Sequence, residues 1–410
     1  DSFPSTVDKL NFVDHISKFL GLAVSQLYLL CALITCYEVI SRYVFDAPTQ
    51  WAFETVMVLC ASAWMLSAGY ITLHKRHIGI TVIYIMVDKA KQWYLDLFAY
   101  VIGVIALWMF VDDTLVRAIE SVMMVERAGS AWNSPQPLIL KTMLVTGATV
   151  YLTQLLVNLY RHFDSKIAKN IISGIAAFII FRIILVFFEH AFELKGVIAI
   201  NEHLSSIAAY IEPTRYVDIR DIGIKWASIL IVGLMILLMT TGMPLGVVTL
   251  FVSILSALFY FGFNGLYLVS TNAFGLLEAY PLIAVPLFVL MASILEKAGV
   301  AEDLFDAMQI FAGKLRGGVA IQTIVVAVVL AAMSGVMGGE IVMLGLVALP
   351  QMIRLGYNKR LAIGVVCASG ALATLIPPSI VMIVYGLSAN VAIGDLFMAG
   401  AVPGLMLATF

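Results

Sequence analysis

Long apolar segments alternate with short polar ones along this chain. A transmembrane helix needs about 20 predominantly apolar residues, and the first part of the sequence supplies five such segments. They lie near 19–40, 51–73, 93–111, 136–160 and 171–190. A polar stretch over 189–225 separates them from a second, glycine-richer apolar region. The pattern predicts an all-α integral membrane protein.

The second apolar region is interrupted more often than the first. It predicts two helices, a broken segment that lies along the membrane interface, and a further helix, in that order over 226–241, 245–262, 264–280 and 281–299. The residues from there to Gly318 are expected to form a loop. The pattern divides the chain into a four-helix membrane domain (1–163), a connecting helix and linker (164–222), and a second membrane domain (223–410).

Composition narrows the class of protein. Hydrophobic residues make up 62% of the chain and charged residues only 12%, whereas a soluble domain has about 25% charged residues. This excludes a water-soluble enzyme, and the net charge of −2 gives no basic excess for binding nucleic acid. Cysteines and histidines form no metal-binding motif, so we expect no catalytic residues, no cofactor and no transition metal.

The distribution of Lys and Arg predicts which loops face the cytoplasm, because positive loops stay on that side. The 74–92 loop and the turn after 160 are basic, whereas 112–127 and 189–225 are acid-rich. The amino terminus is therefore expected inside and the fifth span is expected to end outside. Lys314 and Arg316 precede the segment 318–353, and three basic residues follow it. Both ends of this segment are thus predicted to be cytoplasmic.

The segment 318–353 is apolar except in its middle, which reads Ser334-Gly335-Val336-Met337-Gly338-Gly339-Glu340. Each arm has about 16 residues, roughly 24 Å of helix, which is marginal for crossing the bilayer. We therefore predict a re-entrant helical hairpin that turns at the glycines. The alternative is two short spans joined by an external glycine turn.

The next apolar helix is interrupted at Ala373-Thr374-Leu375-Ile376-Pro377-Pro378-Ser379 and resumes through Tyr385. Two prolines remove two amide donors, so the break is expected to free carbonyls near Ala373 and Thr374. Ser379 can begin the new helix with a hydroxyl cap. Discontinuous helices of this kind are where transporters bind coupling cations and substrates. The alternative is a proline kink used only for packing.

Four charged residues have roles that the pattern alone leaves open. Glu340 lies at membrane depth, where an ionisable residue indicates function: it completes a cation site, takes a proton or contacts substrate, or else it only stabilises the start of the returning helix. Arg182, in the fifth span, has no assignable partner. Arg42 and Glu54 flank one end of the first two spans, which favours a structural ion pair.

The sequence resembles the membrane components of TRAP transporters (tripartite ATP-independent periplasmic transporters). In the second region, "SGVMGGE" stands where that family has its serine–glycine hairpin tip, and "GYNKRLAIGVVCASGALATLIPPSIVMIVYG" resembles the broken helix after it. The first region is similar to the small subunit in "ISRYVFDAPTQWAFE" and "LHKRHI". The resemblance covers about 19–160 and 220–410. It implies a fused small (Q-type) plus large (M-type) subunit.

Two departures from the family qualify the resemblance. The family's large subunit has two inverted halves, each with a hairpin, and this sequence stops at Phe410 after roughly the first half, so we expect it to be a fragment. The tip also has Val336 where the family has a second serine, and Glu340 where it has a small neutral residue. A side-chain ligand at 336 is therefore lost, although its carbonyl remains.

The resemblance implies a sodium-coupled secondary transporter in the bacterial inner membrane that imports a small organic anion, a carboxylate or sulfonate, by an elevator movement. Its implied partner is a periplasmic substrate-binding protein. The implied sodium ligands are Ser334, Val336, Ala373, Ile376 and Pro378, mostly through carbonyl groups. Further residues are expected to neighbour the ion or substrate: Gly335, Gly338, Gly339, Glu340, Thr374, Pro377 and Ser379. The alternatives are an elevator symporter that needs no binding protein and a passive channel.

Overall fold

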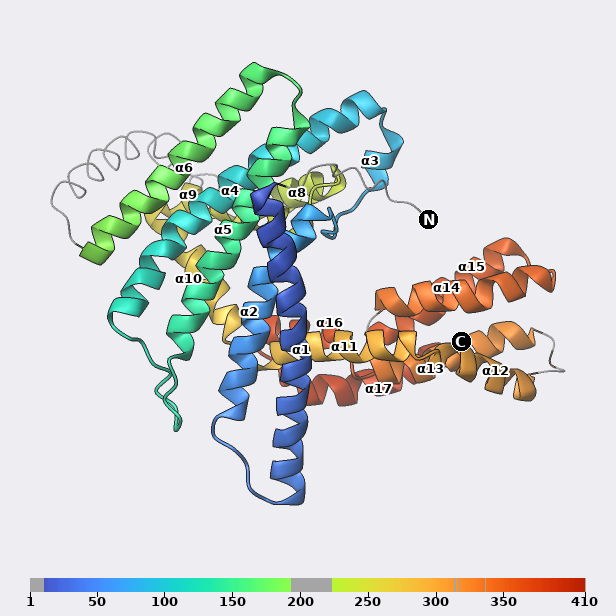
Figure 1. Cartoon of the computed structure of the whole chain (residues 1–410). Helices are drawn as coiled ribbons and strands as arrows, with labels where there is room; N and C mark the ends of the chain where they lie inside the picture. Colours follow the sequence, from blue (N-terminus) through green and yellow to red (C-terminus); the bar gives the residue numbers. More distant parts are fainter. Residues whose placement is uncertain (1–10, 193–222, 313–314, 316, 336, 410) are drawn as a thin grey trace. The chain divides into compact units, whose positions relative to one another are not determined.

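The computed structural model describes residues 11–192, 223–312, 315, 317–335 and 337–409. Every regular element in these ranges is helical, which confirms the all-α prediction (Figure 1). The chain forms two compact units, one ending at Glu278 and the other beginning at Ala279. The boundary predicted near 222 ends a stretch outside the described residues, so the three-part division of the chain stays a prediction.

The first unit begins with the five predicted spans, four of them longer than expected and the second matching its predicted range. They are α1 (Phe12–Val44), α2 (Ala52–Leu73), α4 (Lys89–Met123), α5 (Gln136–His162) and α6 (Lys166–Phe192). A short helix, α3 (Val82–Met86), precedes α4, and α8 (Ile224–Thr240), α9 (Leu245–Phe261) and α10 (Leu266–Leu277) follow. Within the described residues, seven helices are long and apolar enough to cross a membrane.

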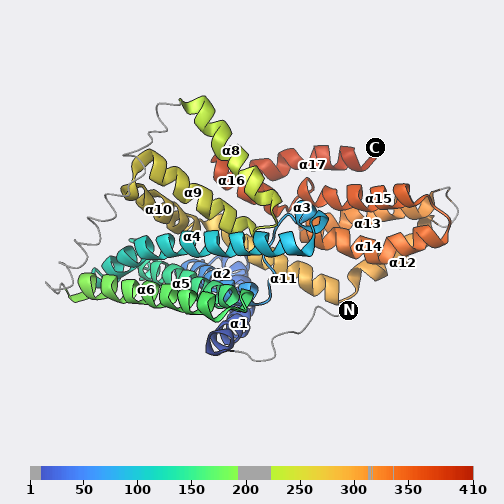
Figure 2. The same ribbon diagram turned by 90° about the horizontal axis from the view of Figure 1, so that it is seen from above.

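Helices of the first unit pack closely, and at one crossing the two backbones come into direct contact range. The pair α1 and α2 is contacted by α5, which also packs on α4 and α6 (Figure 2). A Cβ atom on Gly147 of α5 would lie 2.5 Å from the carbonyl oxygen of Met65 in α2. Only glycine therefore permits this approach. The turn after α8 joins the same unit, because the Leu245 amide donates to the Ile78 carbonyl at 2.8 Å.

Ion pairs within this unit correct two expectations. Arg182 of α6 has a partner, Asp112 of α4, at 3.3 Å. Arg42 pairs with Glu38 one turn away at 2.6 Å, while Glu54 accepts a hydrogen bond from Ser134. The expected pair of Arg42 with Glu54 is therefore wrong. Arg42 pairs within its own helix. Arg182 and Glu54 have partners on segments that the pattern of spans did not place beside them.

The second unit is built from shorter helices. They are α11 (Ala284–Lys297), α12 (Val300–Ala312), α13 (Gly318–Ser334), α14 (Met337–Arg354), α15 (Lys359–Ala371), α16 (Ile380–Ala389) and α17 (Ile393–Thr409). Helix α12 replaces the loop expected there. Phe305, at its centre, is fully buried among residues of α13 and α14, and Gln322 of α13 donates to its carbonyl. This tertiary packing stabilises a helix in a segment with charged ends.

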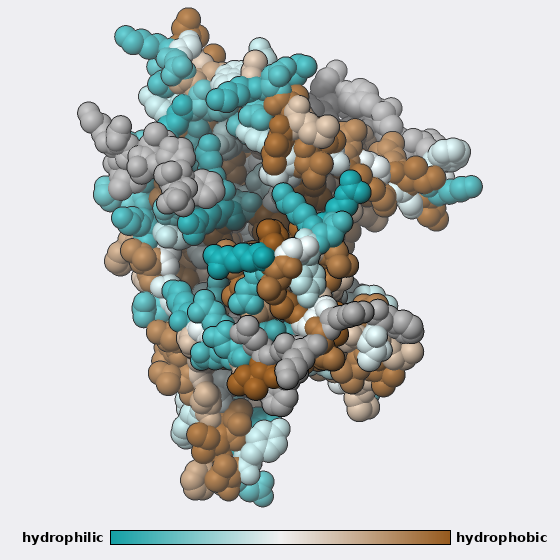
Figure 3. All heavy atoms as spheres, turned by 90° about the vertical axis from the view of Figure 1, so that its right-hand side faces the viewer, coloured by the Kyte–Doolittle hydropathy of each residue, from teal (hydrophilic) through white to brown (hydrophobic). Residues whose placement is uncertain are grey.

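Apolar side chains lie on the surface as well as in the cores. Leu33 of α1 is 68% exposed and Leu346 of α14 is 72% exposed. Brown apolar residues accordingly cover much of the face seen in Figure 3. Soluble proteins rarely expose such extensive apolar area, and helices satisfy their own backbone polar groups, as lipid requires. The surface therefore fits a bilayer and confirms the prediction of a membrane protein.

Candidate functional site

The second unit contains two helices joined at the predicted tip. Both the re-entrant hairpin and the alternative of two short spans have this arrangement, so the re-entrant course stays a prediction. Helices α13 and α14 pack against each other and are joined by Gly335 and Val336, the latter outside the described residues. Gly335 ends α13 in the left-handed conformation, with φ of +62°, and its amide donates to the Ala331 carbonyl at 3.2 Å. Gly338 and Gly339 lie inside the first turn of α14 rather than in the connection. The turn is thus shorter than the glycine pattern suggested.

The predicted break in the following helix is also present. Helix α15 tightens into a 3₁₀ turn, η5 (Leu372–Thr374), and helical structure resumes at Ile380. The Ile376 amide still reaches the Leu372 carbonyl at 2.8 Å. Pro377 and Pro378 then offer no amide hydrogen, so the helical ladder cannot continue through them. The sequence placed this break correctly.

The hairpin tip lies against this break. A Cβ atom on Gly335 would be 2.2 Å from the carbonyl oxygen of Pro378, and the Ile380 amide lies 3.4 Å from the Gly335 carbonyl. One turn before Ser334, Ala331 packs with Ala373 and Ile376 in a buried cluster. The fold therefore brings together four of the five predicted sodium ligands, Ser334, Ala373, Ile376 and Pro378. The fifth, Val336, lies outside the described residues.

Ser379 corrects the expectation of a simple helix cap. It is the residue before α16 and has an extended backbone, but its hydroxyl donates to the Thr374 carbonyl at 3.0 Å. Ser379 is fully buried. One of the carbonyls freed by the break is therefore already satisfied by the protein. Other oxygens of the break, including those of Ala373 and Ile376, remain the better candidates for an ion.

Glu340 lies in the first turn of α14 and is only 2% exposed. The Ser334 hydroxyl donates a hydrogen bond to its Oε1 atom. Its other oxygen, Oε2, has no hydrogen-bond partner among the described residues. The position of Glu340 in the first turn agrees with stabilisation of its charge by the amino terminus of α14. Because Oε2 is buried without a hydrogen bond among the described residues, this stabilisation does not satisfy the whole carboxylate.

A small cavity of about 30 Å³ adjoins Ser334 and Glu340. Its lining includes Glu296, in the last turn of α11. Nothing in the spacing from Glu296 to Glu340 could have placed the two together. Within the described residues, no group of three or more His, Cys, Asp or Glu side chains could hold a metal ion. Cation binding here would depend mainly on backbone and hydroxyl oxygens.

Comparison with known proteins adds two family matches to this geometry. Residues 31–165 match the family described as "Tripartite ATP-independent periplasmic transporters, DctQ component". Residues 232–410 match "Tripartite ATP-independent periplasmic transporter, DctM component". The two matches lie in the order that the sequence resemblance predicted.

Curated relatives agree with the second match. The chain is 35% identical over 198 residues to the C4-dicarboxylate TRAP transporter large permease protein DctM of Rhodobacter capsulatus, covering 45% of each chain. It is 34% identical over 181 residues to the ectoine permease TeaC of Halomonas elongata, 43% of this chain and 42% of that one. It is 36% identical over 138 residues to the isethionate permease DctMQ of Oleidesulfovibrio alaskensis, 34% and 22%. The chain thus spans less than half the length of these relatives, which are named transporter permeases and not enzymes.

Proposed function

This chain belongs to the family of tripartite ATP-independent periplasmic transporters, and we propose that it forms membrane segments of a sodium-coupled importer of a small organic anion. The proposal rests mainly on the contact between the α13–α14 tip and the Pro377–Pro378 break. Two interruptions of helical backbone meet there inside an apolar unit. Irregular backbone at membrane depth is tolerated only where protein, water or an ion satisfies it.

The ligands proposed for sodium follow from this contact. Carbonyl groups of Ala373, Ile376 and Pro378, and of Val336 by sequence position, supply the hard oxygen atoms that such a cation prefers. The Ser334 hydroxyl, which donates to Glu340, is the side-chain oxygen in the proposed set of ligands. The nearby carboxylate would then compensate the ion's charge without contacting it.

The other parts of the proposal rest on the family and on the names of the relatives. Those relatives carry C4-dicarboxylate, isethionate or ectoine in their names, so we propose a carboxylate or sulfonate as substrate. A periplasmic binding protein would deliver it to the inner membrane. The second domain, 223–410, would move as an elevator against a scaffold that includes 1–163.

Uptake measurements test this function. The protein, expressed from its complete gene, is reconstituted in proteoliposomes and supplied with labelled organic acids, with and without an inward sodium gradient and a purified binding protein. We expect uptake only when both are present. Uptake that needs sodium but no binding protein would favour the independent symporter, and downhill flux without either would indicate a channel.

A further inference from the structure

A second, larger cavity lies in the first unit, among α4, α5 and α10. Its volume is about 450 Å³, within the range of small-molecule sites. Both signs of charge line it: Arg117 and Lys141 supply cations, and Glu120 and Glu126 supply carboxylates. Apolar side chains such as Leu144 and Phe274 complete the lining. The cavity is therefore charge-balanced and amphipathic, and the site at the hairpin tip does not include it.

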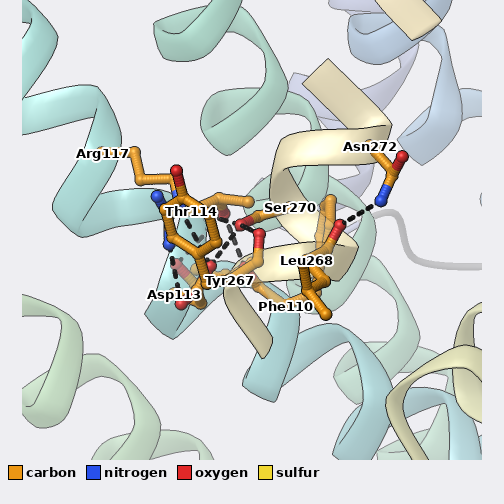
Figure 4. Close-up of polar contacts among 9 residues, drawn as sticks. Phe110, Asp113, Thr114, Arg117, Tyr267, Leu268, Ser270 and Asn272 are labelled. Carbon is orange, nitrogen blue, oxygen red and sulfur yellow. Dashed lines mark hydrogen bonds and ion pairs between the residues drawn. The ribbon is translucent and has the colours of Figure 1, made fainter. Parts of the chain in front are cut away.

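Arg117 is held rigidly at this cavity (Figure 4). Its Nε atom donates to Ser270 at 2.8 Å and lies 3.2 Å from Asp113, while Ser270 donates in turn to Asp113. The guanidinium also stacks 3.8 Å from the centre of the Tyr267 ring. The Nη2 atom donates to Asp113 Oδ1 at 3.5 Å. Among the described residues Nη1 makes no hydrogen bond, so its N–H groups are available to a ligand. An oriented guanidinium of this kind suits a phosphate group.

The second cation is arranged in a similar way. Lys141 Nζ lies 2.5 Å from Glu126 Oε2 and 4.9 Å from the centre of the Phe274 ring. Ser121 donates to the same Glu126 oxygen at 2.6 Å. Burial raises the pKa of Glu126, but the hydrogen bonds from Lys141 and Ser121 outweigh it and hold the pKa below its ordinary value. A carboxylate that stays ionised can receive an ammonium group.

The position of the cavity relative to the hydrocarbon core of the membrane favours a lipid as its ligand. Helix α4 has 35 residues, about 52 Å of helix, which exceeds the hydrocarbon core of about 30 Å. Its apolar stretch ends at Val111, so Arg117 lies one to two turns beyond the core. Tyr267 of α10 is 51% exposed, as expected of an aromatic residue at a membrane interface. On the same helix, Leu276 is 57% exposed and available to acyl chains.

We propose that this cavity binds the headgroup of a zwitterionic aminophospholipid, of the phosphatidylethanolamine type. The phosphate lies between Arg117 and Lys141, and the primary ammonium donates to Glu120 and Glu126. Leu144 and Phe274 contact the first part of an acyl chain. Because α4 and α5 belong to the DctQ-matched residues and α10 to the DctM-matched residues, the lipid would bridge the two matched regions.

The charge pattern makes the headgroup preference testable. A phosphatidylglycerol has no ammonium, so Glu120 and Glu126 would face its phosphate without compensation. A phosphatidylcholine has a quaternary ammonium that cannot donate hydrogen bonds to these carboxylates. The site should therefore prefer phosphatidylethanolamine by about tenfold, the value of roughly one charge-assisted hydrogen bond.

Native mass spectrometry of the delipidated protein, titrated with each of the three lipids, measures this preference. We expect Arg117→Gln to weaken phosphatidylethanolamine binding about tenfold. Glu120→Gln should abolish the preference over phosphatidylcholine. The Glu120 residue is exposed and its side chain makes no hydrogen bond among the described residues, so the fold should be retained. Arg127→Gln and Glu302→Gln are the matched controls. Both residues are exposed and lie outside the cavity lining, so these variants should bind the lipids like the parent.

Two results would overturn the proposal. One is equal affinity of the parent for all three lipids, or unchanged selectivity in Glu120→Gln. The other comes from a competition with soluble glycerophosphoethanolamine: if the free headgroup binds as tightly as the lipid, the cavity is a site for a soluble zwitterion. A lipid site predicts that the soluble compound competes only at much higher concentration, because it lacks the acyl chains.

Discussion

The Ser334 hydroxyl at the end of α13 donates a hydrogen bond to the Glu340 carboxylate in the first turn of α14. This bond joins the two arms of the hairpin across the tip. Since Glu340 is 2% exposed, the hydroxyl also satisfies part of a buried acid that would otherwise be costly. Ser334 therefore has a structural partner in addition to its proposed role toward a cation, and experiments on this residue must separate the two roles.

Gly335 should be intolerant of substitution. Gly335→Ala places a Cβ atom 2.2 Å from the Pro378 carbonyl oxygen in a backbone with φ of +62°, and we expect at least about 2 kcal/mol of destabilisation. Gly338→Ala is the matched control, because Gly338 is helical with nothing within 4 Å of its Cβ position. It should be neutral or stabilising by up to about 1 kcal/mol. Thermal unfolding in detergent compares them, and equal midpoints would show that the tip does not contact the break.

Ser379 should contribute to stability through the Thr374 carbonyl. Ser379→Ala leaves that carbonyl without its 3.0 Å hydrogen bond beside a fully buried residue, at a cost of about 1 kcal/mol or more. Ser388→Ala serves as control, since its exposed hydroxyl donates to the helical Val384 carbonyl at 2.9 Å. We expect a clear fall in the unfolding midpoint for the first variant and little change for the second. The reverse order would contradict this arrangement of the break.

His77, in the loop between α2 and α3, should make stability depend on pH. Burial lowers the pKa of His77 below its ordinary value of 6.5, and the ring lies 2.8 Å from the Thr72 hydroxyl and stacks on Tyr151. The unfolded chain therefore binds a proton near pH 6.5 that the folded chain binds only at lower pH. Stability from this group is present above that value and is lost as pH falls below it.

The His77→Gln variant tests this directly. Between about pH 7.5 and about pH 5.5, the parent should lose more stability than the variant. His74→Gln, which alters an exposed histidine of the same loop, should keep the slope of the parent. Identical slopes for the parent and His77→Gln would mean that folding does not lower the pKa of His77.

The prediction that both ends of the hairpin face the cytoplasm can be tested by labelling. In a variant without the four native cysteines, single cysteines replace Leu315 and Leu355, which are 60% and 64% exposed at the two ends of the hairpin. Both should react with a membrane-impermeant thiol reagent only from the cytoplasmic side. A cysteine at Ser130, in the loop after α4, should react from the periplasmic side. Labelling of 315 and 355 from opposite sides would mean that the segment crosses the membrane an odd number of times and would contradict the predicted placement of its ends.

Periodic and compositional signals were sufficient for the main elements. The segment predicted over 51–73 is α2 (Ala52–Leu73), and the break at Pro377 lies where two missing amides require it. Helix α12 was missed because its stability comes from burying Phe305 against other helices. Local sequence does not contain that information.

Side-chain partners were the least predictable feature. Arg182 and Asp112 are 70 positions apart, and their pairing depends on how α4 and α6 are rotated against each other. The Ser334–Glu340 bond and the approach of Glu296 depend in the same way on helix packing. The sequence could identify the residue types suited to a cation site, but only the fold could show which of them meet.

The central claim is that the hairpin tip and the broken helix form a sodium site, and sodium-dependent thermal unfolding tests it most directly. The parent, Ser334→Ala and Ser388→Ala are unfolded in NaCl and in KCl at equal ionic strength over a range of concentrations. Binding to the folded state raises the midpoint by mass action. We predict a sodium-specific rise for the parent and Ser388→Ala, and a rise for Ser334→Ala that requires at least about fivefold more sodium. A parent whose midpoint does not distinguish sodium from potassium, or a Ser334→Ala variant with the parent's sodium dependence, would contradict the claim.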